Sequence, residues 1–468
     1  MIPMARLAVR WRTYGRLLSL EPFDLSTSEG RSDERHRRIL LTTMAVILAK
    51  AISICTALIS VPLTLHYLGA ERYGMWLTLS AFIAVMSFAD LGMGSGLLTR
   101  IAAANGRGDR EAIGGYISSA FGVLSSIAVV ALAALWIAYS TTPWYALFNV
   151  KSLLAVAESG PSIAVFATCL ALSLPAAVVQ RVQAGLQQGF TSSLWQCAGS
   201  LSALAGILVC TWLQLGLPWL VASYVGAPLV VTTINAVTFF AANKDIAPRV
   251  SKFSSASARA ILSTGVLFLI LQIVAAVSYS SDALIIAHVL GPQSVQQYAV
   301  PERLFNMVGQ VLVMALSPLW PAYGEALARE DHPWVRRTFL RSSAIAIGAA
   351  TLGASALGLT APWLLHLWVG SAVTADPVLI GGFVLWKVIE AAANVTAMLL
   401  NAAHLVKLQV VVALLAGVVT VGLKFLLIPI IGVAGGVWAS IVGFCVCAFI
   451  PLGLGCLKVL RLGVSNGR

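Results

Sequence analysis

The chain has 468 residues, of which 59% are hydrophobic and 10% are charged, and its mean hydropathy is +0.89. A soluble globular protein carries about 25% charged residues, so these values exclude a soluble enzyme. They exclude a disordered chain as well. A net charge of +12 in so apolar a chain indicates membrane orientation rather than nucleic-acid binding. The composition therefore predicts an all-α polytopic membrane protein without a nucleic-acid partner.

A polar arm covering positions 1–38 precedes the first apolar run, which begins near Ile39. The arm is much longer than a secretory n-region and no small-residue cleavage site follows it, so we expect no cleavable signal peptide. It holds eight arginines against five acidic residues. We predict a weakly ordered, basic cytoplasmic arm over 1–38 that contacts anionic lipid head groups.

Twelve apolar stretches of membrane-spanning length follow. We predict spans at 39–66, 73–98, 113–140, 161–182, 190–213, 218–241, 261–290, 298–322, 338–361, 378–402, 408–428 and 433–456. They form two lobes of six helices each. The predicted divisions are an N-lobe at 39–243, a cytoplasmic linker at 244–260, a C-lobe at 261–457 and a cytoplasmic tail at 458–468.

The basic residues fix the orientation of these spans. With the N-terminus in the cytoplasm, 24 of the 30 lysines and arginines fall on the inside, whereas the outside loops hold only Arg72 and Lys151. Cytoplasmic loops of membrane proteins carry such an excess. We therefore predict a multi-pass protein of the bacterial inner membrane with both termini in the cytoplasm.

An internal match relates the two lobes. The first span ends in His66-Tyr67-Leu68-Gly69 and the seventh ends in His288-Val289-Leu290-Gly291. Lys50 precedes the first of these histidines by the same spacing as Gln272 precedes the second, so both lobes place a polar side chain at the same depth. Because six spans per lobe is an even number, this pattern predicts a parallel repeat, related by a pseudo-two-fold axis along the membrane normal.

Ionisable residues inside the spans indicate a polar passage. Eight are expected there: Lys50, Asp90, Asp282, Glu302, Arg303, Lys387, Glu390 and Lys424. A charge at mid-membrane costs about 2.5–3.5 kcal/mol on insertion scales, so eight facing lipid would exceed a typical stability of about 5–15 kcal/mol. Most must therefore face a wet cavity or pair with one another.

The basic candidates have alternative roles. Lys50, near mid-depth with no acid in its own helix, is the first candidate for an anionic substrate, with a buried ion pair as the alternative. Lys387 lies three residues from Glu390 and either pairs with it or binds substrate. Arg303 and Gln272 are further substrate-binding candidates. Lys424, near the outer end of its helix, is expected to snorkel to the interface.

The acidic residues and two prolines are candidates for coupling or gating. Asp90, before a glycine-rich stretch, and Asp282 would each hold a coupling proton or cation, or pair with a base such as Arg100. Glu302 and Glu390 belong to the same group. Pro318 and Pro321 predict a broken helix that acts as a gate hinge, or an ordinary helix end.

No catalytic or metal-binding constellation stands out in the sequence. The seven cysteines and six histidines lack metal spacing. We expect no enzymatic activity and no cofactor, with a coupling proton or Na⁺ left open.

Several segments resemble Wzx-type oligosaccharide flippases of the MOP superfamily, which also contains MATE exporters and lipid II flippases. The resemblance spans about 39–456, and it is carried by Tyr67–Trp76, Phe88–Gly92, Tyr298–Phe305, Ser317–Ala326 and Ile431–Gly436. It implies two six-helix lobes around a central cavity that opens alternately to either side. The implied substrate is an undecaprenyl-diphosphate-linked repeat unit for surface polysaccharide, O-antigen or exopolysaccharide. A polysaccharide polymerase and other assembly proteins are candidate partners.

Two other functions are alternatives to the flippase that the resemblance implies. A MATE-like drug exporter would favour an acidic cavity, and the balance of four basic and four acidic candidates does not exclude it. A membrane glycosyltransferase would need large outside loops with catalytic residues, which the sequence lacks.

Overall fold

The structure, a computed structural model, describes residues 21, 23–24, 27–86, 88–148, 150–291, 294–369 and 376–465. Throughout these ranges every regular element is helical, which confirms the predicted all-α class. Most of the predicted arm lies outside the described residues, as do the last three residues of the tail. The chain forms two compact units, one ending at Val266 and one beginning at Leu267.

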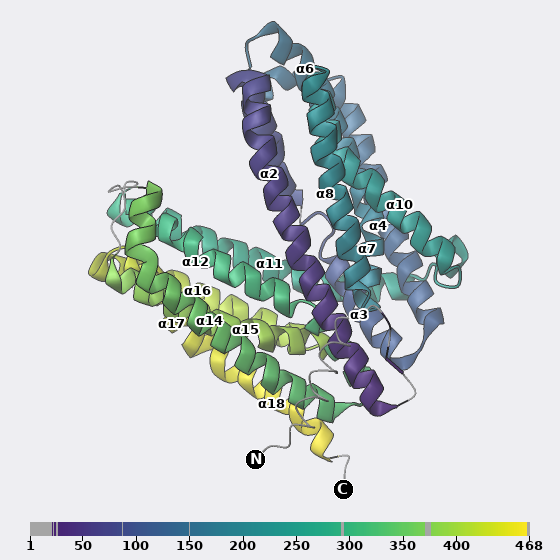
Figure 1. Cartoon of the computed structure of the whole chain (residues 1–468), viewed down its shortest axis with the longest axis vertical. Helices are drawn as coiled ribbons and strands as arrows, with labels where there is room; N and C mark the ends of the chain where they lie inside the picture. The colour runs from purple at the N-terminus through teal and green to yellow at the C-terminus, as the bar shows by residue number, and fades with distance from the viewer. Residues whose placement is uncertain are drawn as a thin grey trace. The chain divides into compact units, whose positions relative to one another are not determined.

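The first unit begins with α2 (Ser28–Met86), which packs along α8 over much of its length (Figure 1). Gly69 has φ 72° and ψ 171° and divides α2 into two helices at a kink. The other elements are α3 (Met93–Arg107), α4 (Arg110–Tyr139), α5 (Trp144–Leu147), α6 (Leu153–Ala176), α7 (Val178–Gly185), α8 (Gly189–Trp212), α9 (Leu217–Val221), a π-helical turn (Ala222–Gly226), α10 (Ala227–Ala242), a 3-10 turn (Val250–Lys252) and the start of α11 (Ser255–Leu290).

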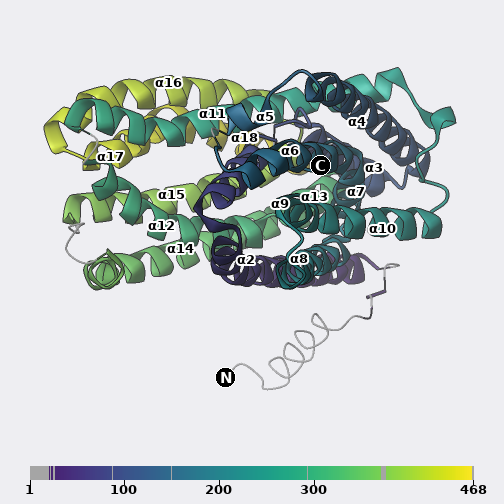
Figure 2. The ribbon, with the colours of Figure 1, turned by 90° about the horizontal axis from the view of Figure 1, so that it is seen from above.

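The second unit contains the rest of α11 and the C-terminal helices. These are α12 (Val295–Leu316), α13 (Leu319–Ala328), α14 (His332–Val369), α15 (Pro377–Ala402), α16 (Val406–Ile431), α17 (Ala434–Phe444), a π-helical turn (Cys445–Phe449) and α18 (Ile450–Ser465). Helices α12, α14 and α15 pack side by side, and α16 packs against α17 (Figure 2). Their core is apolar and aromatic, and it includes Phe305, Phe383 and Ile428.

The same turns recur in both units. Gly69 (φ 72°) and Gly291 (φ 88°) have left-handed backbones. A second left-handed pair, Gly108 (φ 71°) and Glu330 (φ 59°), is separated by the same number of residues. Two further left-handed pairs recur at a slightly shorter spacing; they are Gln187 with His404 and Gly216 with Gly432. A left-handed residue ends a helix and redirects the chain. The two units therefore break the chain at corresponding points, which supports the internal repeat.

A capping residue follows one of these turns in each unit. Asp109 Oδ1 accepts a hydrogen bond from the backbone N–H of Ala112 at 2.9 Å, and Asp331 Oδ1 accepts one from Trp334 at 3.3 Å. These bonds satisfy donors that a helix start leaves open. They begin α4 and α14, the third long helix of each half.

Eleven helical stretches in the described residues are long and apolar enough to cross a membrane. The predicted second span, 73–98, is not among them because a turn at Phe88–Gly92 separates α2 from α3. Leu91 (φ 52°) and Gly92 (φ 71°) are both left-handed in this turn. The predicted eighth span is also broken, since α12 ends at Leu316 and α13 begins at Leu319.

Large apolar side chains cover much of the outer surface. Ile137, Leu352 and Val418 are 73%, 76% and 74% exposed, which water would disfavour and lipid tails would not. Exposed tryptophans lie at helix ends that the predicted topology places outside, where aromatic residues gather in membrane proteins; they are Trp136, Trp212, Trp219, Trp363 and Trp368. The surface is that of a multi-pass membrane protein.

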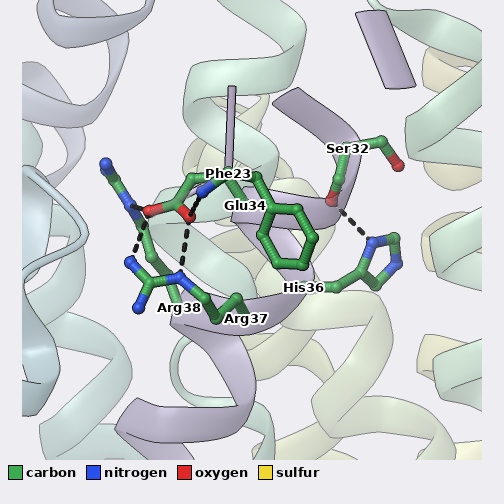
Figure 3. A network of polar contacts seen from close by, with 6 residues as sticks. All are labelled: Phe23, Ser32, Glu34, His36, Arg37 and Arg38. Atoms are coloured by element: carbon green, nitrogen blue, oxygen red, sulfur yellow. Dashed lines mark hydrogen bonds and ion pairs between the residues drawn. The ribbon is translucent and has the colours of Figure 1, made fainter. Parts of the chain in front are cut away.

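The polar start of α2 is organised around one buried carboxylate. Glu34 is 2% exposed and accepts hydrogen bonds from Arg37 at 2.7 and 2.8 Å, from Arg38 at 2.7 Å and from the Phe23 N–H at 3.1 Å (Figure 3). Two arginines of the predicted basic arm thus share one carboxylate, which offsets one of their two positive charges. The backbone N–H of Phe23 therefore lies beside the first turns of α2.

Candidate functional site

A buried ion pair joins α11 and α16 inside the second unit. The Lys424 ammonium is fully buried, lies 2.9 Å from Asp282 Oδ1, and donates to Ser278 O at 2.9 Å and Ser281 Oγ at 3.0 Å. Ser278, Ser281 and Asp282 follow a three- and four-residue spacing, which places them on one face of α11. The expectation that Lys424 snorkels is therefore wrong, because neighbouring helices enclose it.

A second lysine joins α12 and α15. Lys387 is 2% exposed, and its ammonium donates to Asn306 Oδ1 and to Glu390 Oε2, each at 2.7 Å. Glu390 is half-buried. The local pairing predicted from the three-residue spacing is present, and Asn306 is an additional acceptor that the sequence analysis missed.

Glu302 lies beside both pairs. It is half-buried, four residues before Asn306 on α12, and interacts electrostatically with Asp282, Lys387 and Lys424. Among the described residues it is not a member of either ion pair. Its neighbour Arg303 is exposed. Three carboxyl groups therefore share this interior with two ammonium groups, which gives one excess negative charge when all five groups are ionised.

A cavity of about 320 Å³ extends from this set of charges. It is lined only by the second unit, with Asp282, Tyr298, Glu302 and Asn306 at one end. A cavity of about 370 Å³ in the first unit has almost wholly apolar lining, with Ser173 its single hydroxyl among the described residues. The two units have similar helices but different interiors.

Asp90 accepts hydrogen bonds from the backbone at the start of α3, rather than pairing with Arg100. Its carboxylate accepts backbone hydrogen bonds from Gly92 at 2.8 Å and Gly94 at 3.1 Å. Arg100 instead donates to Thr264 Oγ1 at 3.4 Å. The aspartate thus stabilises the start of α3 at the break in the second span.

The proline-containing segment forms a helix break. Pro318 occupies the turn between α12 and α13, and Pro321 lies in the first turn of α13. Both are buried. A proline in a first turn removes an N–H that has no helical partner. Both prolines therefore fit the break, and this structure holds the segment in one conformation.

The two remaining candidates lie apart from the set of charges. Lys50 is exposed on α2 in the first unit, and Gln272 is half-buried on α11 in the second. Ser278 and Ser281, which accept from Lys424, and Asn306, which accepts from Lys387, were not predicted from the sequence. Their short spacing along the chain to Asp282 and Glu302 is the sequence signal that could have identified them. Among the described residues no group of His, Cys, Asp or Glu has the arrangement of a metal site.

Comparison with known proteins places this site in a transporter fold. Three similar solved structures are an outward-facing multidrug resistance MATE transporter of the MOP superfamily (14% identity, TM-score 0.74, 91% of this chain and 96% of that chain), a MATE protein in a bent conformation (14%, 0.77, 93% and 97%) and a MOP superfamily transporter from Pyrococcus furiosus (15%, 0.75, 91% and 96%). At these identities the likeness shows the fold alone.

No curated protein matches the sequence. The model of the family described as polysaccharide biosynthesis protein matches residues 39–326, more than half of the chain. The chain therefore belongs to the polysaccharide biosynthesis protein family and has the fold of MOP superfamily transporters.

Proposed function

We propose that this protein is a flippase for an undecaprenyl-diphosphate-linked oligosaccharide repeat unit. It moves the repeat unit from the cytoplasmic to the periplasmic leaflet of the bacterial inner membrane by alternating access. The observation that carries the proposal is the match of residues 39–326 to the polysaccharide biosynthesis family in a chain with a transporter fold. The buried set of charges in the second unit supplies a candidate coupling site. The polymerase and other assembly proteins are its proposed partners.

The burial of the charged side chains separates two proposed roles. Lys50 on α2 and Arg303 on α12 are each exposed, and each is a proposed contact for the diphosphate within its own unit. Gln272 on α11 is a further polar candidate. Lys387 is held by Glu390 and Asn306, and its proposed role is therefore in coupling rather than in substrate binding. A diphosphate needs accessible cations, which a buried and already paired lysine does not offer.

The coupling ion is proposed to be a proton carried by Glu302. One proton neutralises the excess charge of the set, whose other members are Asp282, Glu390, Lys387 and Lys424. Sodium would need several oxygen ligands around one point, whereas two carboxylates here already face ammonium groups. A protonated Glu302 leaves the interior neutral, which lowers the cost of rearranging it in a low-dielectric environment.

The substrate role is tested by complementation of a deletion strain. We expect the deletion to accumulate lipid-linked repeat units and to lose surface polysaccharide. Wild type, Lys50→Arg and the outer-loop control Lys151→Ala should restore it, whereas Lys50→Ala at equal membrane level should not. A deletion without accumulated precursor would overturn the flippase proposal, and full rescue by Lys50→Ala would remove Lys50 from the substrate site.

The coupling role is tested in the same strain with Glu302→Gln, a nearly isosteric change that cannot ionise. We expect at least a tenfold loss of precursor clearance, while the exposed control Glu111→Gln keeps wild-type clearance. In wild type, collapse of the pH gradient should give the same loss. If the Glu302→Gln variant clears precursor as fast as wild type and its clearance still falls when the pH gradient is collapsed, Glu302 is not the proton carrier.

A MATE-like cation-coupled exporter is the second candidate. The likeness to MATE transporters and the acidic groups of the cavity fit it as well. It predicts normal precursor levels in the deletion strain together with increased sensitivity to cationic drugs.

A further inference from the structure

The cavity of the second unit is elongated. On α11 its lining runs from Asp282 to Leu271, and on α16 from Thr420 to Gln409. Each stretch covers eleven residue steps, or about 16 Å at about 1.5 Å per residue. With the predicted topology, Asp282 lies near the outer ends of the helices and Gln409 near the inner ends. The cavity therefore covers about half of the hydrocarbon thickness.

Polar side chains are distributed along this length. Ser278, Thr420 and Ser440 follow the charged end, Asn394 lies further in, and Gln409 lies at the inner end. Small residues leave the space between them; they are Ala275, Ala393, Ala397, Ala413, Ala416 and Gly417. A cavity holds water when it is roomy and offers polar partners. About 320 Å³ has room for on the order of ten waters.

Helix α15 adds a polar stripe along the same route. Lys387, Glu390, Asn394 and Asn401 recur at helical spacings of three, four and seven, which place them on one helix face. At the inner end, Gln409 Nε2 donates to Asn401 Oδ1 at 2.9 Å, and both side chains are 8% exposed. This amide pair lies at the inner end of the cavity, close to the left-handed turn at His404 (φ 58°).

We propose that this cavity, which the second unit alone lines, is a water-filled proton route between the buried charges and the cytoplasm. The inference rests on the proposed function, because it takes Glu302 as the proton carrier. Protons from the outside reach Glu302 over a short distance, since Glu302 lies two helical turns from the start of α12. The inner half of the membrane is the longer barrier, and the cavity spans it. The proton leaves the Glu302 carboxyl for water and exits past the Asn401–Gln409 pair, so no covalent bond between heavy atoms changes.

The test measures accessibility from the cytoplasmic side. In a variant of the full chain whose seven cysteines are replaced and which keeps the wild-type membrane level and melting temperature, single cysteines are introduced at Ala397, on the cavity wall, and at Ala391, which has 0% exposure on the same helix. Inside-out membrane vesicles are treated with a small cationic methanethiosulfonate. We expect Ala397→Cys to react at least ten times faster than Ala391→Cys.

A cavity-filling substitution tests whether access to Ala397 runs through this cavity. Ala413 lies one turn from Gln409 on the cavity wall, and Ala413→Phe should slow labelling of Ala397→Cys at least tenfold. Labelling of Lys50→Cys, in the other unit, should keep its rate. Equal labelling of Ala397→Cys with and without Ala413→Phe, or labelling no faster than Ala391→Cys, would overturn the route.

The labelling rates do not depend on what the protein transports. If the deletion strain shows no accumulated precursor while the labelling pattern is as expected, the flippase proposal fails and the hydrated route stands. If complementation succeeds and the labelling pattern is absent, the flippase proposal stands and the route fails.

Discussion

Replacing Lys424 by methionine should strongly destabilise the second unit. Lys424 is 0% exposed and Asp282 is 4% exposed, so methionine would leave a buried carboxylate without its counter-charge. Two further acceptors, Ser278 O at 2.9 Å and Ser281 Oγ at 3.0 Å, would lose their donor. Breaking one side of a buried ion pair costs about 3–5 kcal/mol. We therefore expect a clear fall in the apparent melting temperature of the purified protein, measured by fluorescence-detected size exclusion after heating.

Two further variants define the cause of that loss. In the double variant Lys424→Met/Asp282→Asn the uncompensated charge is gone, so most of the stability should return. Arg110 and Asp245 form an exposed ion pair with side chains 57% and 51% accessible, and Arg110→Met should cost less than about 1 kcal/mol. If Lys424→Met melts like wild type, or if the double variant melts lower than Lys424→Met, the electrostatic explanation is wrong.

Two smaller predictions concern the first unit and the surface. A Cβ at Gly96 would lie 2.5 Å from Ile261 O, so Gly96→Ala should cost about 1–3 kcal/mol of stability and lower the melting temperature. The control Gly422→Ala, whose Cβ would have no atom within 4 Å, should melt like wild type. Equal melting temperatures of the two variants would contradict the close packing at Gly96. The Arg110 guanidinium beside Asp245 holds the pKa of that carboxyl below its ordinary value of 3.8, so the pair stabilises the fold above that pH and loses its effect as the pH falls through the lower folded value. The small difference in melting temperature between wild type and Asp245→Asn should therefore be present at neutral pH and shrink below the ordinary carboxyl pKa of 3.8, and a difference that grows on acidification would refute the pairing.

Hydropathy and charge were sufficient to predict the helical membrane class. Spans of about 20 apolar residues are a local property, because the membrane leaves backbone groups no partner outside the helix. The span at 73–98 failed as a continuous helix. Its residues are mostly apolar, but Leu91 and Gly92 adopt left-handed backbones that end one helix before α3 begins. Hydropathy averages over such a turn and does not detect it.

The internal repeat was readable because turns leave short sequence marks. His66–Gly69 and His288–Gly291 share a glycine that the structure shows at φ 72° and φ 88°. Glycine adopts positive φ without a Cβ clash, so this residue type is tied to its backbone position. The equivalent positions Gly108 and Glu330 escaped notice, since only one of the two is a glycine.

The candidate site shows where sequence reasoning ends. The sequence alone was enough to predict which ionisable residues fall within the spans, because insertion energetics depend on residue type and position along the span. It also identified the Lys387–Glu390 pair, whose three-residue spacing is a contact within one helix. It gave the wrong environment for Lys424 and no partner for Asp282, because the two lie on helices far apart in the chain and meet only when α11 packs against α16. Contacts between helices depend on how the helices associate, so the tertiary structure alone decided which charges are buried together and that a cavity extends from Asp282 and Glu302.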